Sequence, residues 1–201
     1  MYARSRGKIR RVARLHADSS VLVVVDTQPG FLDKLPGDEA ARVADRIRWL
    51  CRLADWLGVP VVVTEEEPDR NGETAEPVKD ALPAGTVRHA KPAFDLAACP
   101  EILADVERHE HDTVVLVGLE TDVCVAQSAL GLLATGKRVV VVEDAVGSPG
   151  ATHEQGLARL ARAGVELIGV KGLAYEWLGT VERASDFAAA SERDTPDGIV
   201  L

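Results

Sequence analysis

The sequence lacks the features that mark several special classes of protein. No apolar run reaches the roughly 20 residues that a membrane-spanning helix needs, so we expect no membrane partner. The first residues include no apolar segment like that of a secretory signal, and we expect a cytoplasmic protein. The three cysteines, Cys51, Cys99 and Cys124, are spaced for neither a disulfide framework nor a zinc site. Reduced thiols agree with the expected location.

Several motifs of nucleotide-binding and hydrolase folds are also missing. TQPGF follows the first apolar run, where a dinucleotide-binding fold would have GxGxxG, and the chain contains no GxxxxGK[ST]. No serine, Ser128 included, lies in the GxSxG motif of serine hydrolases. The sequence therefore favours neither class, and we expect no cofactor.

Charge is unevenly distributed along the chain. The formal net charge is −9, yet residues 1–16 carry six Lys or Arg and no acid. Such a basic arm is compatible with nucleic-acid or anionic-surface contact, but an extra strand, a packing arm or a loose tail explains it more often. Because the rest of the chain is acidic, we expect no nucleic-acid partner.

Short runs of β-branched residues alternate with segments of helical periodicity. We expect strands at 20–26, 60–64, 86–91, 113–119, 138–144 and 165–170, and helices at 39–58, 99–110, 123–135, 150–163 and 173–190. Strands that are apolar throughout indicate a parallel sheet covered on both faces. The predicted fold is a three-layer α/β/α, doubly wound domain with a six-stranded, mostly parallel, Rossmann-like sheet. The 201 residues suit a basic arm at 1–18, one domain at 19–190 and a tail at 191–201.

Three chemically active residues follow the ends of predicted strands. Asp26 ends the first strand, Lys91 ends the third, and Cys124 lies past the fourth, near the start of the next helix. Ligands bind beyond the carboxyl ends of such strands, so the three side chains are expected at one rim of the sheet. An acid, an amine and a thiol are the components of a nucleophilic site. Taken singly, each has a structural explanation as a turn former, a surface amine or a buried packing residue.

The chemical case for Cys124 depends on its expected surroundings. A free thiol titrates near ~8.5, and a helix N-terminus or a nearby cation lowers that pKa. We expect Lys91 to supply the cation, Asp26 to accept the thiol proton, and N–H groups at the helix start to hold an oxyanion. Cys51, on a predicted core helix, and Cys99, before a proline, are expected to be packing residues.

Four motifs, in this order and spacing, give the chain a family resemblance. They are VLVVVDTQPGF (21–31), KPAF (91–94), VVLVGLETDVCV (114–125) and GKRVVVVEDAVGS (136–148). From about 20 to 178, the chain resembles the isochorismatase-like cysteine hydrolases. The resemblance places the family's Asp–Lys–Cys triad on Asp26, Lys91 and Cys124.

The resemblance also implies details of the reaction. It implies a cis peptide bond between Leu119 and Glu120, which would direct the amides of Glu120 and Cys124 at the oxyanion. Members with the cysteine mostly hydrolyse amides or related C–N bonds, whereas those that hydrolyse the vinyl ether of isochorismate typically lack it. The implied reaction is amidase-like and passes through a thioester on Cys124. The resemblance further implies a homo-oligomer.

One stretch departs from the nicotinamidase-like members, which bind a metal through an acid and several histidines. Residues 64–77 read TEEEPDRNGETAEP, with six acids and no histidine. We therefore expect no metal, and we interpret His109 and His111 as surface residues. Because like charges repel, the acidic stretch favours a small neutral or cationic substrate.

Aromatic and amide side chains near the predicted triad are candidates for the substrate pocket. Gln28 and Phe31 follow the first strand and Phe94 follows the third, although ordinary packing explains them equally well. Trp177 is a weaker candidate, at a helix start that would cap a neighbouring subunit's site. The alternative to a hydrolase is a non-catalytic isochorismatase-like protein that acts through oligomeric interactions.

Overall fold

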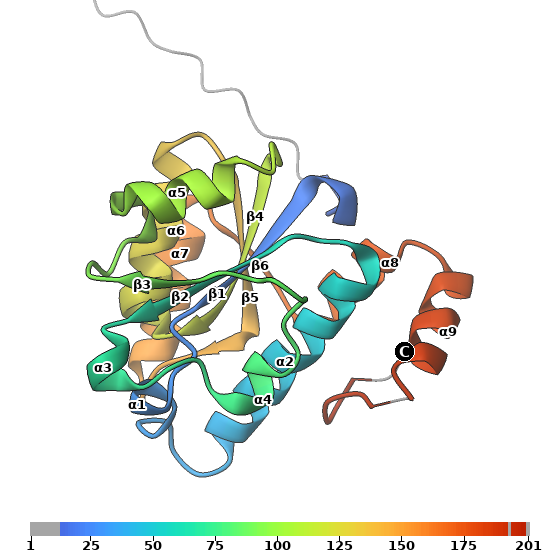
Figure 1. Cartoon of the computed structure of the whole chain (residues 1–201), viewed down its shortest axis with the longest axis horizontal. Coiled ribbons are helices and arrows are strands. Elements are labelled where there is room, and N and C mark those ends of the chain that lie inside the picture. Colours follow the sequence, from blue (N-terminus) through green and yellow to red (C-terminus); the bar gives the residue numbers. More distant parts are fainter. Residues whose placement is uncertain (1–12, 193, 200–201) are drawn as a thin grey trace, which may run out of the picture.

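A six-stranded sheet forms the centre of the computed structural model, which describes residues 13–192 and 194–199. The strand order is β3-β2-β1-β4-β5-β6, and every neighbouring pair is parallel (Figure 1). The strands are β1 (Ser20–Val25), β2 (Val61–Glu66), β3 (Arg88–Lys91), β4 (Thr113–Leu119), β5 (Arg138–Gly147) and β6 (Glu166–Ile168). The predicted three-layer fold is confirmed.

Helices cover both faces of the sheet. They are α1 (Pro29–Leu32), α2 (Glu39–Leu57), α3 (Pro68–Asn71), α4 (Glu76–Lys79), α5 (Pro100–Glu107), α6 (Ala126–Ala134), α7 (Thr152–Ala163), α8 (Val170–Leu178) and α9 (Val181–Ala190). Short helical segments lie at η1 (Ala17–Ser19), η2 (Leu96–Ala98) and η3 (Thr121–Val125), the last of which is π-helical.

The two faces of the sheet form two separate hydrophobic cores. α2 and α8 cover one face (Figure 1). α9 packs against α2, where Trp49 is fully buried and its ring lies 5.5 Å from that of Phe187. α5, α6 and α7 cover the other face, with Ile102 and Leu132 among the buried side chains. β1 lies between the two cores and all six of its residues are buried, as its uninterrupted apolar run predicts.

Two predicted helices have a different form in the structure. The helix predicted at 173–190 is two helices, because Gly179 adopts a left-handed conformation that ends α8, and Thr180 caps α9 by accepting a hydrogen bond from Arg183 N. The helix predicted at 123–135 is preceded by the π-helical segment η3, and α6 itself begins at Ala126. The four-residue helices α1, α3 and α4 are too short to show periodicity in the sequence.

The strand order reverses direction at the centre of the sheet. Chain connections run outward in one direction from β1 to β3 and in the other from β4 to β6, so β1 and β4 flank the switch point where α/β folds bind ligands. Gly118 lets the two strands approach each other here: its φ is 117°, and a Cβ would collide with the Val25 carbonyl. The ends of β1 and β4 are thereby held together.

The predicted arm and tail are only partly described. Residues 1–12 of the arm, and residues 193, 200 and 201 of the tail, lie outside the described part of the chain. Asp194 pairs with Arg48 and Arg52 of α2, at 2.7 and 2.6 Å. The division into arm, domain and tail stays a prediction. Among the helices described, none combines the length and apolarity needed to cross a membrane, and the cytoplasmic location also stays a prediction.

Candidate active site

Asp26 lies directly after β1 and is fully buried. Its φ of 43° is in the left-handed region, which Asp tolerates better than most residues. Asp26 Oδ1 accepts a hydrogen bond of 2.7 Å from Thr64 Oγ1. Its Oδ2 lies 2.9 Å from Lys91 Nζ, and this ion pair compensates an oxygen that has no aligned hydrogen-bond donor among the described residues.

Lys91 ends β3 and its side chain is buried, which is unusual for an unpaired lysine but not for one in an ion pair. The ammonium donates to the Ala93 and Phe94 carbonyls at 2.6 and 3.4 Å. It also lies 3.6 Å from Cys124 Sγ. Lys91 therefore lies between the acid and the thiol, as a cation that contacts both.

Cys124 lies in η3, where the chain leaves β4 and enters α6. Its residue is 2% exposed. α7 packs closely on this segment, and a Cβ on Gly156 would lie 3.0 Å from the Asp122 backbone. Helical packing thus holds the thiol at the end of the sheet, facing Lys91.

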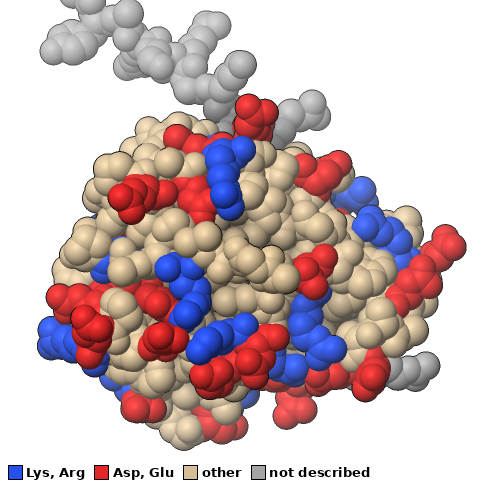
Figure 2. All heavy atoms as spheres, in the orientation of Figure 1, with Lys and Arg blue, Asp and Glu red and all other residues tan. Residues whose placement is uncertain are grey.

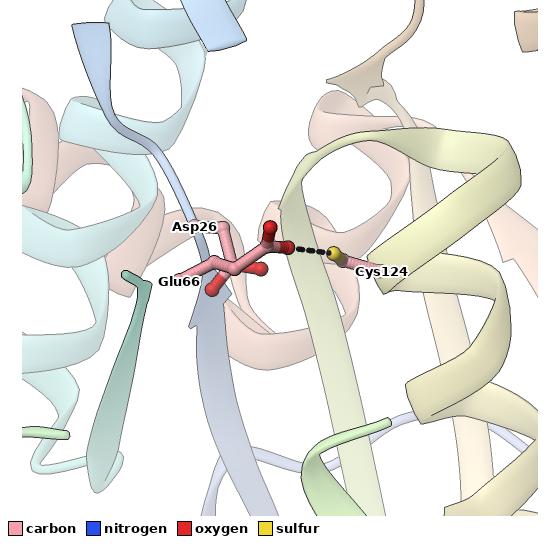
Figure 3. Close-up of side chains that lie close together, drawn as sticks. All are labelled: Asp26, Glu66 and Cys124. Carbon is pink, nitrogen blue, oxygen red and sulfur yellow. Dashed lines mark hydrogen bonds between the residues drawn. The ribbon is translucent and has the colours of Figure 1, made fainter. Parts of the chain in front are cut away.

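Glu66 is a fourth member of the cluster that the sequence did not single out. It ends β2 and pairs with Lys91 in the sheet register. The Cys124 thiol donates a hydrogen bond of 2.9 Å to Glu66 Oε2, and Lys91 Nζ lies 3.9 Å from the same oxygen. Figure 3 shows Glu66 reaching toward Cys124 beside Asp26. The predicted second strand ends at residue 64, so no strand-end signal in the sequence marks Glu66.

The electrostatic environment holds the resting thiol neutral. Burial, the Asp26 carboxylate and the hydrogen bond to Glu66 raise the pKa of Cys124 well above its usual range, and Lys91 opposes this only in part. Burial also raises the pKa of Asp26, against the opposing effects of Lys91 and Thr64. For Lys91, burial lowers the pKa, but Asp26 and Cys124 more than offset it. The prediction of a lowered thiol pKa is wrong, because the thiol is buried and one cation faces two carboxylates.

Ligand atoms of Asp26, Glu66 and Cys124 lie within 4.8 Å of one another, close enough to hold a metal ion. The ammonium of Lys91 already contacts this set, at 2.9 Å from Asp26 and 3.6 Å from the sulfur. A metal ion at the same point would meet that positive charge at short range. The residues present therefore fit a lysine-compensated nucleophile better than a metal centre.

The predicted pocket residues differ in exposure. Gln28 is fully buried, and its amide binds both peptide groups of Glu66: Oε1 accepts from Glu66 N at 2.7 Å and Nε2 donates to Glu66 O at 3.0 Å. Phe31 is buried in α1, whereas Phe94 is 50% exposed. The peptide bond between Leu119 and Glu120 is cis. Substrate contact by the side chains and oxyanion binding at the cis peptide stay predictions.

Three other residues considered in the sequence analysis lie outside the cluster. Trp177 is 2% exposed in the core and donates from Nε1 to Ser20 Oγ at 3.3 Å, so it is not available to cap a neighbouring site. The rings of His109 and His111 stack at 6.3 Å in the connection between α5 and β4. No group of possible metal ligands found among the described residues includes them.

Known proteins of this fold match most of the chain. The family model for the isochorismatase domain matches residues 20–171. The secreted isochorismatase effector Isc1 of Phytophthora sojae is 33% identical over 178 residues, which cover 83% of this chain and 80% of that protein. The solved structure of MAR1 ribonuclease from Caenorhabditis elegans is 26% identical, covers 94% of this chain and 98% of its own, and superposes with a TM-score of 0.81. YcaC of Escherichia coli, described as an octameric hydrolase of unknown specificity, is 23% identical, covers 91% and 93%, and also has a TM-score of 0.81.

Proposed function

The chain belongs to the isochorismatase family, and on that premise we propose that it is a cysteine-dependent hydrolase of a C–N bond in a small amide or carbamoyl compound. The observation that carries the proposal is the convergence of Asp26, Lys91 and Cys124. They come from the ends of β1 and β3 and from the segment after β4, and Lys91 lies within 3.6 Å of both the acid and the sulfur. A buried acid, amine and thiol in contact are the components of nucleophilic catalysis.

The proposed reaction has two stages. The thiol proton passes to a carboxylate, the role in which the sequence predicts Asp26, and the sulfur attacks the carbonyl carbon while Lys91 stabilises the thiolate. The C–N bond breaks as the leaving nitrogen takes the proton, and a thioester remains on Cys124. A water molecule gives a proton to the carboxylate and attacks the thioester, which releases the acid and regenerates the thiol.

The charges of the site favour a neutral or cationic substrate. Two carboxylates and a neutral thiol face one ammonium, so an anionic group would meet net negative charge. Lys34 pairs with Glu120 at 3.4 Å beside the predicted oxyanion site, so this ion pair leaves the net charge of the site unchanged. Small uncharged amides such as benzamide, and cationic ones such as glycinamide, are the substrates that fit.

A substrate panel tests the proposal. We expect ammonia release from at least one of benzamide, nicotinamide, glycinamide or urea with wild-type protein, and none above background with Cys124→Ala. Cys99→Ala is the matched control, because Cys99 lies outside the cluster and should keep full turnover. Turnover by Cys124→Ala at the wild-type rate would overturn the proposal.

The ribonuclease named among the similar structures makes RNA a necessary member of the panel. A phosphodiester would bring negative charge toward Asp26 and Glu66. On the face drawn in Figure 2, acidic and basic side chains are interspersed, whereas a backbone-binding surface gathers Lys and Arg. We expect no cleavage of a single-stranded oligoribonucleotide. Cleavage that depends on Cys124 would show that the substrate assignment is wrong.

We also propose a homo-oligomer, for which the octameric description of YcaC is the support. Light scattering coupled to size-exclusion chromatography should give a mass of two or more times that of the 21.5 kDa chain. A monomer at micromolar concentration would contradict this part of the proposal.

A further inference from the structure

We propose that Glu66 determines the substrate specificity of this site: its carboxylate binds a positive charge next to the carbonyl carbon, so that α-ammonium amides are preferred over uncharged ones. This inference rests on the proposed function and leaves proton transfer with Asp26. Glu66 ends β2, and Figure 3 shows its carboxylate directed at Cys124. The thiol donates to Glu66 Oε2 at 2.9 Å, so a group bound to this carboxylate lies next to the carbon that the sulfur attacks.

Glu66 is the member of the cluster that is most accessible to solvent. The side chains of Asp26 and Lys91 are fully buried, whereas the Glu66 side chain is 15% exposed. Cys124 is 2% exposed. A substrate that enters from solvent therefore meets the negative charge of Glu66 before the positive charge of Lys91. This order of contact favours a cationic substrate over an anionic one.

One carboxylate oxygen of Glu66 is available to a substrate. Oε2 contacts the thiol and lies 3.9 Å from Lys91 Nζ. Oε1 accepts no hydrogen bond from the part of the chain that the structure describes, and it is not among the buried unpaired oxygens of that part, so it faces solvent. A carboxylate makes its strongest hydrogen bonds with charged donors, and a substrate ammonium is the matching partner.

The ammonium of Lys91 is shared between two acids and does not neutralise both. It lies 2.9 Å from Asp26 Oδ2 and donates to the Ala93 and Phe94 carbonyls at 2.6 and 3.4 Å. All three partners are closer to it than the Glu66 carboxylate. Asp26 also contacts the thiol, but it is buried beneath it. Of the two acids, Glu66 is therefore the one that can face the cation of a substrate.

The Glu66 carboxylate is directed from a fixed backbone. Gln28 binds the peptide N–H and the carbonyl of Glu66 at 2.7 and 3.0 Å, and Asn71 Nδ2 donates to the same carbonyl at 2.8 Å. A charge held in place binds its partner with a smaller loss of conformational entropy than a mobile one. A substitution confined to the carboxylate leaves these backbone contacts intact.

The short distance between the sulfur and the carboxylate limits where the substrate can carry its charge. In glycinamide, one methylene group joins the ammonium to the carbonyl carbon, which suits the 2.9 Å between Sγ and Oε2. Glycolamide carries a hydroxyl in place of the ammonium and is the neutral match, and oxamate carries a carboxylate beside its amide. At pH 6.5, below the ordinary α-amino pKa of about 7.7, glycinamide is a cation.

Wild-type protein tests the order of the three amides without any substitution. We expect kcat/KM for ammonia release at pH 6.5 to be about tenfold or more higher for glycinamide than for glycolamide, because the bound ammonium makes a charged hydrogen bond. Oxamate should be the poorest of the three. An equal value for glycinamide and glycolamide, or a preference for oxamate, would overturn the inference.

Glu66→Gln removes the charge and keeps the size of the side chain. The ratio of kcat/KM for glycinamide to that for glycolamide should fall by about tenfold or more. Glu67→Gln is the matched control, because Glu67 pairs with Arg70 at the surface, and it should keep the ratio within about twofold. Continued protection of the buried Cys51 from iodoacetamide shows that Glu66→Gln is folded. An unchanged ratio in the folded variant would contradict a role of Glu66 in specificity.

Binding to Cys124→Ala separates this inference from the proposed function. Calorimetry should give a Kd for glycinamide about tenfold or more below that for glycolamide, and adding Glu66→Gln should make the two alike. If wild type hydrolyses amides through Cys124 without preferring glycinamide, the inference fails and the proposed function stands. If glycinamide binds through Glu66 while Cys124→Ala turns over at the wild-type rate, the proposed function fails and the specificity stands.

Discussion

The Cys124 thiol donates a 2.9 Å hydrogen bond to the Glu66 carboxylate across 58 residues of sequence. The thiol is thereby held neutral next to an acceptor for its proton, instead of being stored as a thiolate. A neutral thiol reacts slowly with electrophiles that do not bind in the site, because the thiolate is the nucleophilic form. Reactivity then depends on a substrate that completes the proton transfer.

The first prediction concerns the three native thiols. Burial raises the pKa of Cys51 to about 12, and burial with two carboxylates raises that of Cys124 further. Cys99 is partly exposed and should therefore be the first to react with iodoacetamide at pH 7.5. Peptide mass spectrometry over time checks the order. Rapid labelling of Cys124 before Cys99 would indicate a resting thiolate and contradict the raised pKa.

The buried ion pair predicts an effect on stability. Asp26→Asn leaves the Lys91 ammonium with Glu66 at 3.9 Å as its remaining carboxylate, and breaking a buried pair costs about 3–5 kcal/mol. We expect the free energy of unfolding in urea to fall by a comparable amount.

Asp26→Asn with Lys91→Met is the matched double variant. Removing both charges should recover much of the stability without recovering turnover. If Asp26→Asn alone is as stable as wild type, the ion pair of Asp26 and Lys91 is not buried as described.

Gly118 predicts a steric requirement where β4 pairs with β1. Its φ of 117° and the contact that a Cβ would make with Val25 make Gly118→Ala costly, by about 3 kcal/mol or more in the free energy of unfolding. Gly136→Ala is the control, since its φ is 91° but nothing lies within 4 Å of a Cβ. That variant should lose only about 1 kcal/mol. Equal losses would refute close packing of β1 on β4.

The raised thiol pKa also predicts how stability depends on pH. The folded pKa of Cys124 exceeds the unfolded value of 9.0, so its contribution to stability is complete below pH 9.0 and declines as the pH rises through the folded value. By pH 10 the loss is about 1.4 kcal/mol for this thiol. Cys124→Ala should therefore lose less stability than wild type between pH 8 and pH 10 in urea titrations. Parallel curves for the two proteins would contradict a raised pKa.

Much of the fold was predictable because the strands are unusually uniform. β1 and β4 are buried along their whole length and read as continuous apolar runs, which distinguish parallel strands from helices. The break at Gly179 was less visible, because glycine inside a helical pattern is compatible with both a continued and an ended helix.

The sequence predicts the site residues that follow a predicted strand end, and it misses Glu66 because β2 is longer than the predicted strand. The sequence places the end of the second strand at Thr64 and leaves Glu66 in an acidic stretch. Gln28 binds the Glu66 backbone and β3 pairs Glu66 with Lys91, so the strand extends through it. Neither contact can be read from local sequence, since both join segments distant in the chain. The direction of the thiol pKa was missed for the same reason.

The most direct test of the account is to trap the acyl-enzyme. Wild-type protein is mixed with its fastest panel amide, quenched in acid within the first turnovers and weighed intact. We predict a mass increase equal to the acyl group, located on the Cys124 peptide and removed by hydroxylamine. An acyl group on another residue, or hydrolysis of the same amide by Cys124→Ala at the wild-type rate, would contradict the account.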